Sequence, residues 1–124
     1  MILAVDCSKG LNLIFFRKNK IFYQFNNSNI SNASEILIPK IESIFKEKKI
    51  SYKSISKIII INGPGSFTGI RASITFAKIL KLTLSVPIYG FSKFEIVNFL
   101  SNSENTFNKT IFIHHNNENF FISK

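Results

Sequence analysis

The stretch "IIIINGPGSFTGIRASITFAKILK" (residues 58–81) decides the fold of this 124-residue chain. Its uninterrupted apolar start, Ile58–Ile61, is typical of a parallel strand that is covered on both faces. A loop with three glycines and one proline follows, and apolar residues then recur at helical spacing. The stretch therefore predicts a central strand, a tight corner and an amphipathic helix over residues 67–84.

Three strands and a helix are predicted before this unit. "MILAVD" is a short apolar run, and "LNLIFFRKNKIFYQF" has two β-rich arms about Lys18-Asn19, where Asn tolerates turn geometry. "SNASEILIPKIESIFKEKKI" then changes to helical spacing. Because Pro39 is tolerated only in a first turn, this helix should begin near Ala33 or later. Its candidate caps are Ser31, Asn32 and Ser34.

Three more elements are predicted after it. "VPIYGF" (86–91) indicates a short strand, and "SKFEIVNFL" a helix capped by Ser92 with Glu95 three residues later. The order up to this point is β-β-β-α-β-α-β-α. The last segment, "TIFIHHNNENFFISK", has two β-like arms about a His/Asn turn and predicts a hairpin.

The composition is that of a folded domain. Hydrophobic residues make up 45%, the mean hydropathy is +0.16, and there are fourteen Phe. The net charge of +9 attracts anions such as tRNA. However, the richness in Ile, Phe, Lys and Asn matches A/T-rich codons, and Lys occurs in every segment, which favours an ordinary solvated surface.

Cysteine content and apolar runs bound the compartment. Cys7 is the only cysteine, so no intrachain disulfide and no zinc site around several thiols is expected. No run approaches the ~20 apolar residues of a membrane helix. We expect a soluble cytoplasmic protein without a membrane segment, metal or cofactor.

The glycine loop does not match the three glycine-rich patterns that bind phosphate, bind a dinucleotide or hold a nucleophile. A P-loop needs Lys after its last glycine, but Ile70 and Arg71 follow Gly69. The dinucleotide spacing G-x-G-x-x-G is one residue too long here, and Pro64 interrupts it. A nucleophile elbow needs G-x-S-x-G, which "GSFTG" does not supply.

Two readings of the loop stay open. In the structural one, Gly63 and Gly65 permit unusual backbone angles, Ser66 or Thr68 caps the helix, and Gly69 brings it close to the sheet. In the functional one, the helix N-terminus with Ser66, Thr68 and Arg71 captures an anion. We favour the structural reading.

Other polar residues give weaker signals. Asp6, at the carboxyl end of the first strand, either holds a ligand or hydrogen-bonds the next turn, and we favour the second role. His114 and His115 are neighbours on a predicted strand, so their side chains point to opposite faces and cannot share one metal.

Four stretches of the sequence resemble a known protein family. "MILAVDCS", "EILIPKI", "NGPGSFTGIRASITFAK" and "VPIYGFS" resemble, in this order, the TsaB (YeaZ) family over about residues 1–100. The resemblance implies an α/β fold: one RNase H-like half of the actin/Hsp70-like ATPase (ASKHA) fold, with a mixed five-stranded sheet, helices and a C-terminal β-hairpin. The implied domains are an RNase H-like unit, 1–104, and a hairpin remnant of a second half, 105–124.

The resemblance also implies a function. Family members are non-catalytic subunits that bind and position TsaD, which transfers a threonylcarbamoyl group to adenosine 37 of tRNA. A small ATPase, TsaE, joins them, and tRNA is reached indirectly through the complex. The signature loop is Gly63, Pro64, Gly65, Ser66, Phe67, Thr68, Gly69 and Arg71. The candidate partner-interface residues on the two helices are Ile41, Ile44, Phe45, Ile74 and Ala77, each of which could instead face the sheet.

The chain departs from the family near its end. Where the second half should open with D-A-R and E-V-Y-like strands, the chain has "IFIHHNNENFF", with His114 for Asp and Asn116 for Arg. Two rival hypotheses are therefore kept: a small phosphate- or nucleotide-binding enzyme that uses the Gly63–Arg71 loop, and a decayed remnant without function. Without its partner, the chain could also form a homodimer.

Overall fold

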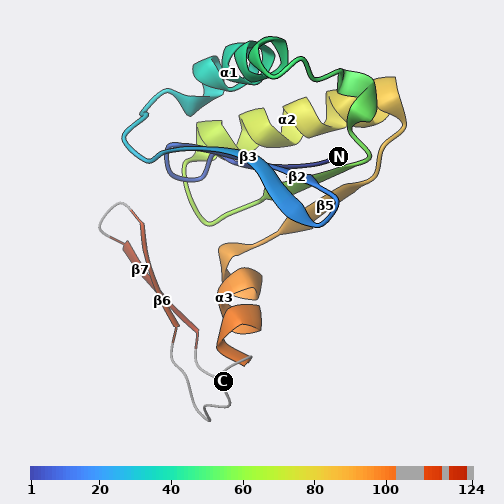
Figure 1. Cartoon of the computed structure of the whole chain (residues 1–124). Helices are drawn as coiled ribbons and strands as arrows, with labels where there is room; N and C mark the ends of the chain where they lie inside the picture. Colours follow the sequence, from blue (N-terminus) through green and yellow to red (C-terminus); the bar gives the residue numbers. More distant parts are fainter. Residues whose placement is uncertain (103–110, 116–117, 123–124) are drawn as a thin grey trace.

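A computed structural model describes residues 1–102, 111–115 and 118–122. The elements follow the predicted order (Figure 1). In chain order they are β1 (Ile2–Asp6), β2 (Leu11–Arg17), β3 (Lys20–Asn27), α1 (Ala33–Glu47), the 3-10 helix η1 (Tyr52–Ser54), β4 (Lys57–Ile61), α2 (Phe67–Leu84), β5 (Ile88–Phe91), α3 (Lys93–Asn102), β6 (Ile111–His115) and β7 (Glu118–Ile122).

Five strands form one mixed sheet, as expected, and their order in the sheet is β3-β2-β1-β4-β5. β2 runs antiparallel to β1 and β3, whereas β4 runs parallel to both β1 and β5. The β2–β3 turn is the predicted one: Lys18 and Asn19 have φ of 50° and 60°, the left-handed pair that suits a two-residue hairpin. The parallel pairing of β4 with β5 uses α2 as its crossover, because parallel strands need a long connection.

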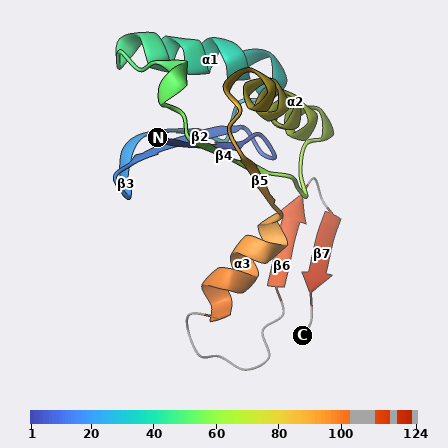
Figure 2. The ribbon, with the colours of Figure 1, turned by 90° about the vertical axis from the view of Figure 1, so that its right-hand side faces the viewer.

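The hydrophobic core lies between the sheet and α1 and α2, which both cover the same face (Figure 2). Alternate residues of β1, β2 and β4 point into it, among them Leu3, Leu13 and Ile58, each 0% exposed. Phe15 is at its centre, with its ring 6.0 Å from that of Tyr23 and 5.8 Å from that of Phe45. Burying a ring of this size contributes roughly 2–3 kcal/mol.

The second face of the sheet is only partly covered, which corrects one prediction. Ile58 and Ile60 of β4 are buried, but Ile59 and Ile61 are only half-buried. The apolar run predicted burial on both sides. Both long helices lie on one side, however, and the periodicity of a strand does not say how many helices cover each face.

Pro39 corrects a second prediction, because it lies inside α1 and not in the first turn. Proline has no amide hydrogen, so the carbonyl of Glu35 loses its hydrogen-bond donor. A proline in a helix interior lowers the stability of the helix by roughly 3 kcal/mol. Pro39 and Glu35 are both on the exposed side of α1, where water can hydrate the carbonyl. The predicted start at Ala33 is confirmed.

The caps of the two later helices follow the sequence signals. Ser66 Oγ accepts from the Gly69 amide at 3.3 Å, and Ser92 and Glu95 form a reciprocal capping box. Hydrogen bonds to Ser92 hold the pKa of Glu95 below its usual value.

The hairpin β6–β7 is antiparallel and lies beside α3, away from α1 and α2 (Figure 2). The predicted domain boundary at 104/105 lies outside the described residues. Within the described part of the chain, no helix is both long and apolar enough to cross a bilayer.

Candidate functional site

The strand-to-helix corner packs tightly on the end of β1. A Cβ added to Gly65 would lie 2.7 Å from Ser8 Cα and closer still to Ser8 Cβ and O, and one on Gly69 would collide with the carbonyl oxygen of Cys7. The Ser66 amide donates to the carbonyl of Ser8 at 2.8 Å. Gly63 has φ of 126° and its peptide bond to Pro64 is cis. The glycines therefore place the start of α2 directly against the turn after β1.

The polar groups of this corner are committed to the fold. Asp6 Oδ1 accepts from the Ser8 amide at 2.8 Å and also from Ser8 Oγ, so it orders the turn after β1. Ser66 Oγ caps α2 and lies 3.4 Å from Thr68 Oγ1. Two of the amides that a phosphate would need, those of Ser66 and Gly69, donate to this chain's own oxygens. This arrangement supports the structural reading of the loop and of Asp6.

The remaining reactive groups at the corner are not poised for chemistry. Cys7 is 0% exposed, and burial, with the nearby Asp6 charge, raises the pKa of its thiol to about 12. It is therefore a neutral core residue and not a nucleophile. The Arg71 guanidinium lies over the exposed Phe67 ring, 5.1 Å from its centroid. Among the described residues, no group of three or more His, Cys, Asp or Glu could hold a metal ion.

The structure divides the five candidate interface residues into core and surface. Ile41, Ile44, Phe45 and Ala77 are at most 4% exposed and belong to the core between the helices and the sheet. Their burial makes them core residues in this fold. Helical spacing alone does not tell which of two apolar helix sides faces the sheet, so the sequence could not separate core from surface positions. Ile74 is half-buried at the outer side of the core.

Sequence reasoning placed Lys78 on the outer side of α2 and named Ile74, but it missed the exposed apolar side chains of Phe67 and Leu82 there. Counted at 100° per residue, its outward positions fall on successive turns and carry mixed apolar and basic side chains. We call them the α2 stripe: Phe67, Arg71, Ile74, Lys78 and Leu82. Phe67 is 70% and Leu82 84% exposed, which is unusual for large apolar side chains. The signal in the sequence was that α2 is apolar on more of its circumference than one sheet face requires.

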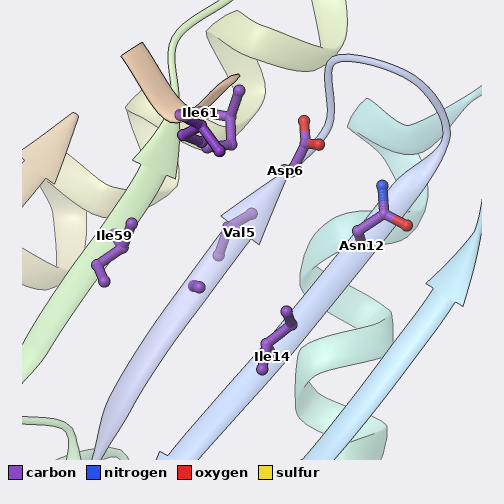
Figure 3. A pocket seen from close by; sticks show the side chains of 8 residues that line it. Val5, Asp6, Asn12, Ile14, Ile59 and Ile61 are labelled. Carbon is purple, nitrogen blue, oxygen red and sulfur yellow. The ribbon is translucent and has the colours of Figure 1, made fainter. Parts of the chain in front are cut away.

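A pocket of about 240 Å³ lies on the sheet face opposite α1 and α2 (Figure 3). Ala4, Ile14, Ile59 and Ile61 form its apolar floor, and Ile96 of α3 closes one side. Asp6 and Asn12, which are cross-strand partners, stand at one end. No Lys or Arg lines this pocket, so it does not suit a phosphate.

Comparison with known proteins agrees with the fold and the motif. The TsaD family model, described as tRNA N6-adenosine threonylcarbamoyltransferase, matches residues 27–107, more than half of the chain. The chain is 33% identical over 97 residues to the tRNA threonylcarbamoyladenosine biosynthesis protein TsaB of Buchnera aphidicola subsp. Schizaphis graminum, covering 78% of this chain and 46% of that protein. It is 32% identical to TsaB of Bacillus subtilis, with coverages of 76% and 42%.

Solved structures agree on the fold. YeaZ from Pseudomonas aeruginosa superposes with a TM-score of 0.71 at 17% identity, covering 99% of this chain and 64% of YeaZ. The chain spans less than half the length of each of the two TsaB relatives. The sheet order, the glycine corner and these matches agree, and the chain belongs to the TsaB (YeaZ) family.

Proposed function

We propose that this chain is a non-catalytic partner subunit that binds and positions a TsaD-like subunit for threonylcarbamoyl transfer to adenosine 37 of tRNA. Its relatives are named for the biosynthesis of that modified nucleoside. The absence of catalysis is supported by the local chemistry: Ser66 and Asp6 are engaged in the fold, and Cys7 is buried and protonated.

The observation that carries the proposal is the α2 stripe. Protein interfaces centre on a few large side chains surrounded by polar ones, and Phe67, Ile74 and Leu82 on one helix face fit that pattern. Arg71 and Lys78 lie beside these three residues and supply the polar side chains that surround such anchors in an interface. A stable heterodimer buries roughly 1,200–2,000 Å², so neighbouring α1, where Ile38 is 45% exposed, would belong to the same contact.

The test is co-purification with the TsaD-like subunit encoded in the same genome. Leu82→Glu places a charge in the α2 stripe, at its C-terminal end, and disturbs no core residue, because Leu82 is 84% exposed. Losing a large apolar anchor of an interface costs ~2 kcal/mol, so the dissociation constant should rise about thirtyfold. Phe99→Glu on α3, where Phe99 is 76% exposed, is the matched control and should bind normally.

A modification assay with the reconstituted enzyme completes the test. Omission of this chain, or its replacement by Leu82→Glu, should lower threonylcarbamoyl transfer to tRNA. Unchanged transfer without the chain would refute the proposed role, and normal binding by a folded Leu82→Glu variant would refute the position of the interface. Binding of a TsaE-like ATPase and homodimer formation stay predictions.

A further inference from the structure

The fold separates charge along the strand direction. The amino ends of β1, β4 and β5 lie at one end of the sheet, together with the β2–β3 turn, because Ile2 pairs with both Phe16 and Lys57. The last turns of α1 and α2 reach the same end, on the right-hand side of Figure 1, where the chain also begins. Segments as far apart in sequence as Ile2 and Ile88 therefore form one surface.

The charge balance of the two ends differs sharply. At the carboxyl ends of the parallel strands, three cations (Lys9, Arg71 and Lys93) face three carboxylates (Asp6, Glu35 and Glu95). At the amino end, nine described Lys or Arg side chains stand against one carboxylate, Glu47, which pairs with Lys48 at 2.8 Å. A further carboxylate, Glu42, is more than a turn back along α1. Among the residues that the structure describes, the excess of positive charge is thus at the amino end of the sheet.

Helix ends explain only part of this cluster. Lys46 and Lys81 belong to the last turns of α1 and α2, and Lys48 follows the last turn of α1, where the helix dipole favours cations. The other six lie on strands, turns and the 3-10 helix or just past α1, and all six are exposed. We call these six the basic pole: Arg17, Lys18, Lys20, Lys49, Lys53 and Lys57. A basic composition alone predicts an even spread of Lys, which the structure does not have.

The width of the basic pole favours a polymer over a small anion. β3 and β4, which carry Lys20 and Lys57, are three strand spacings apart, about 14 Å. This exceeds the screening length of about 8 Å at physiological ionic strength, so one small anion cannot neutralise both sides. An extended chain of phosphates can.

An aromatic side chain at the same end favours nucleic acid over an acidic peptide. Phe22 on β3 is 41% exposed, and the Arg17 guanidinium lies over its ring, 4.8 Å from the centroid. Exposed rings and planar guanidinium groups are the surfaces on which unpaired bases stack. An acidic peptide would gain nothing from this ring.

We propose that the basic pole binds the phosphate backbone of an RNA strand, with Phe22 and Arg17 as the stacking surface for a base. The identification of that RNA as the tRNA substrate rests on the proposed function. The basic pole is at one end of the sheet and the α2 stripe is on the outer face of a helix, so one subunit can contact RNA and a protein partner at once.

The test is a fluorescence anisotropy titration of labelled tRNA with the full chain over a range of salt concentrations. The pole variant is Lys20→Gln/Lys53→Gln/Lys57→Gln. The matched control, Lys9→Gln/Lys40→Gln/Lys93→Gln, removes the same charge from outside both the basic pole and the α2 stripe. In 0.1 M salt the pole variant should bind at least about tenfold more weakly, and its log–log salt slope should be smaller by about 2–3. The control should stay within about twofold of the unmodified chain.

The Lys49→Gly variant distinguishes the effect of a lost charge on tRNA binding from an effect of lost stability. Lys49 has φ of 52°, a left-handed conformation that glycine adopts without strain. The variant should therefore unfold at the same or a higher urea concentration and still bind tRNA more weakly. Weaker binding cannot then be attributed to unfolding.

The proposal would be overturned if the unmodified chain did not bind tRNA, or if the pole and control variants were weakened equally. It would also be overturned if a Phe22→Leu variant bound tRNA normally and polyglutamate of equal charge displaced tRNA from the chain. The last result would assign the basic pole to an acidic protein instead. Co-purification with the TsaD-like subunit is scored separately, so loss of one activity with retention of the other identifies which proposal has failed.

Discussion

Gly69→Ala tests whether the glycine corner acts by close packing. A Cβ at this position would lie about 1 Å inside the 3.0 Å separation that real Cβ atoms keep, and it would meet the rigid backbone carbonyl of Cys7. The start of α2 must then move away from β1. Overpacking costs ~1–3 kcal/mol, and a clash with rigid backbone puts this site at the upper end, about 3 kcal/mol. The better helix propensity of alanine returns about 1 kcal/mol. We expect a net loss of about 2 kcal/mol in the free energy of unfolding.

Gly90→Ala is the matched control for this substitution. Its Cβ would meet Asn62 Nδ2 at 3.4 Å and Ile60 Cγ1 at 3.8 Å, which are ordinary contacts. Neither Gly69 nor Gly90 has a positive φ, so the backbone admits alanine at both. The Gly90 variant should stay within about 0.5 kcal/mol of the unmodified chain.

The assay is urea unfolding followed by circular dichroism at 222 nm. For a slope of ~2 kcal/mol per molar urea, the Gly69 variant should lose about 1 M from its midpoint, and the Gly90 variant should lose little. Equal midpoints for the two variants, or a Gly69 variant as stable as the unmodified chain, would refute the close-packing argument. The corner would then tolerate a side chain, and its glycines would need another explanation.

Two further predictions concern buried groups. Ala77→Glu should abolish cooperative unfolding, because an unpaired carboxylate at a site that is 0% exposed costs several kcal/mol. A variant that circular dichroism shows to be folded would contradict the assignment of Ala77 to the core. The Cys7 thiol should resist iodoacetamide at pH 8 in the native chain and react in urea, because burial raises its pKa to about 12 from 9.0. Folding favours the protonated thiol, so this contribution to stability is complete below pH 9 and is lost as the pH rises from about 9 to 12, which urea midpoints at several pH values would measure.

Local signals in the sequence predicted local structure well. Ser92 and Glu95 at capping-box spacing form that box, Ser66 caps α2, and Lys18-Asn19 makes the two-residue turn. Each of these depends on atoms within three or four residues, so the interaction is present in the sequence itself. Pro39 is the exception: its effect depends on whether the helix side that carries it meets water.

Long-range features could not be predicted in the same way. Spacing identified Ile44 and Ala77 as apolar helix positions, but only the placement of both helices on one sheet face decided that they are core and that Leu82 is surface. The same placement left Ile59 half-buried.

The sequence by itself determined the order of the elements, the glycine corner and the family, because these depend on short-range spacing and on a contiguous motif. Only the tertiary structure decided what the corner's glycines touch, which side of α2 faces outward, and where the charge lies. Lys20 and Lys57 are far apart in the chain and come to one end of the sheet because β3 and β4 are aligned through β1 and β2. A surface made from distant segments exists only after these strands have paired.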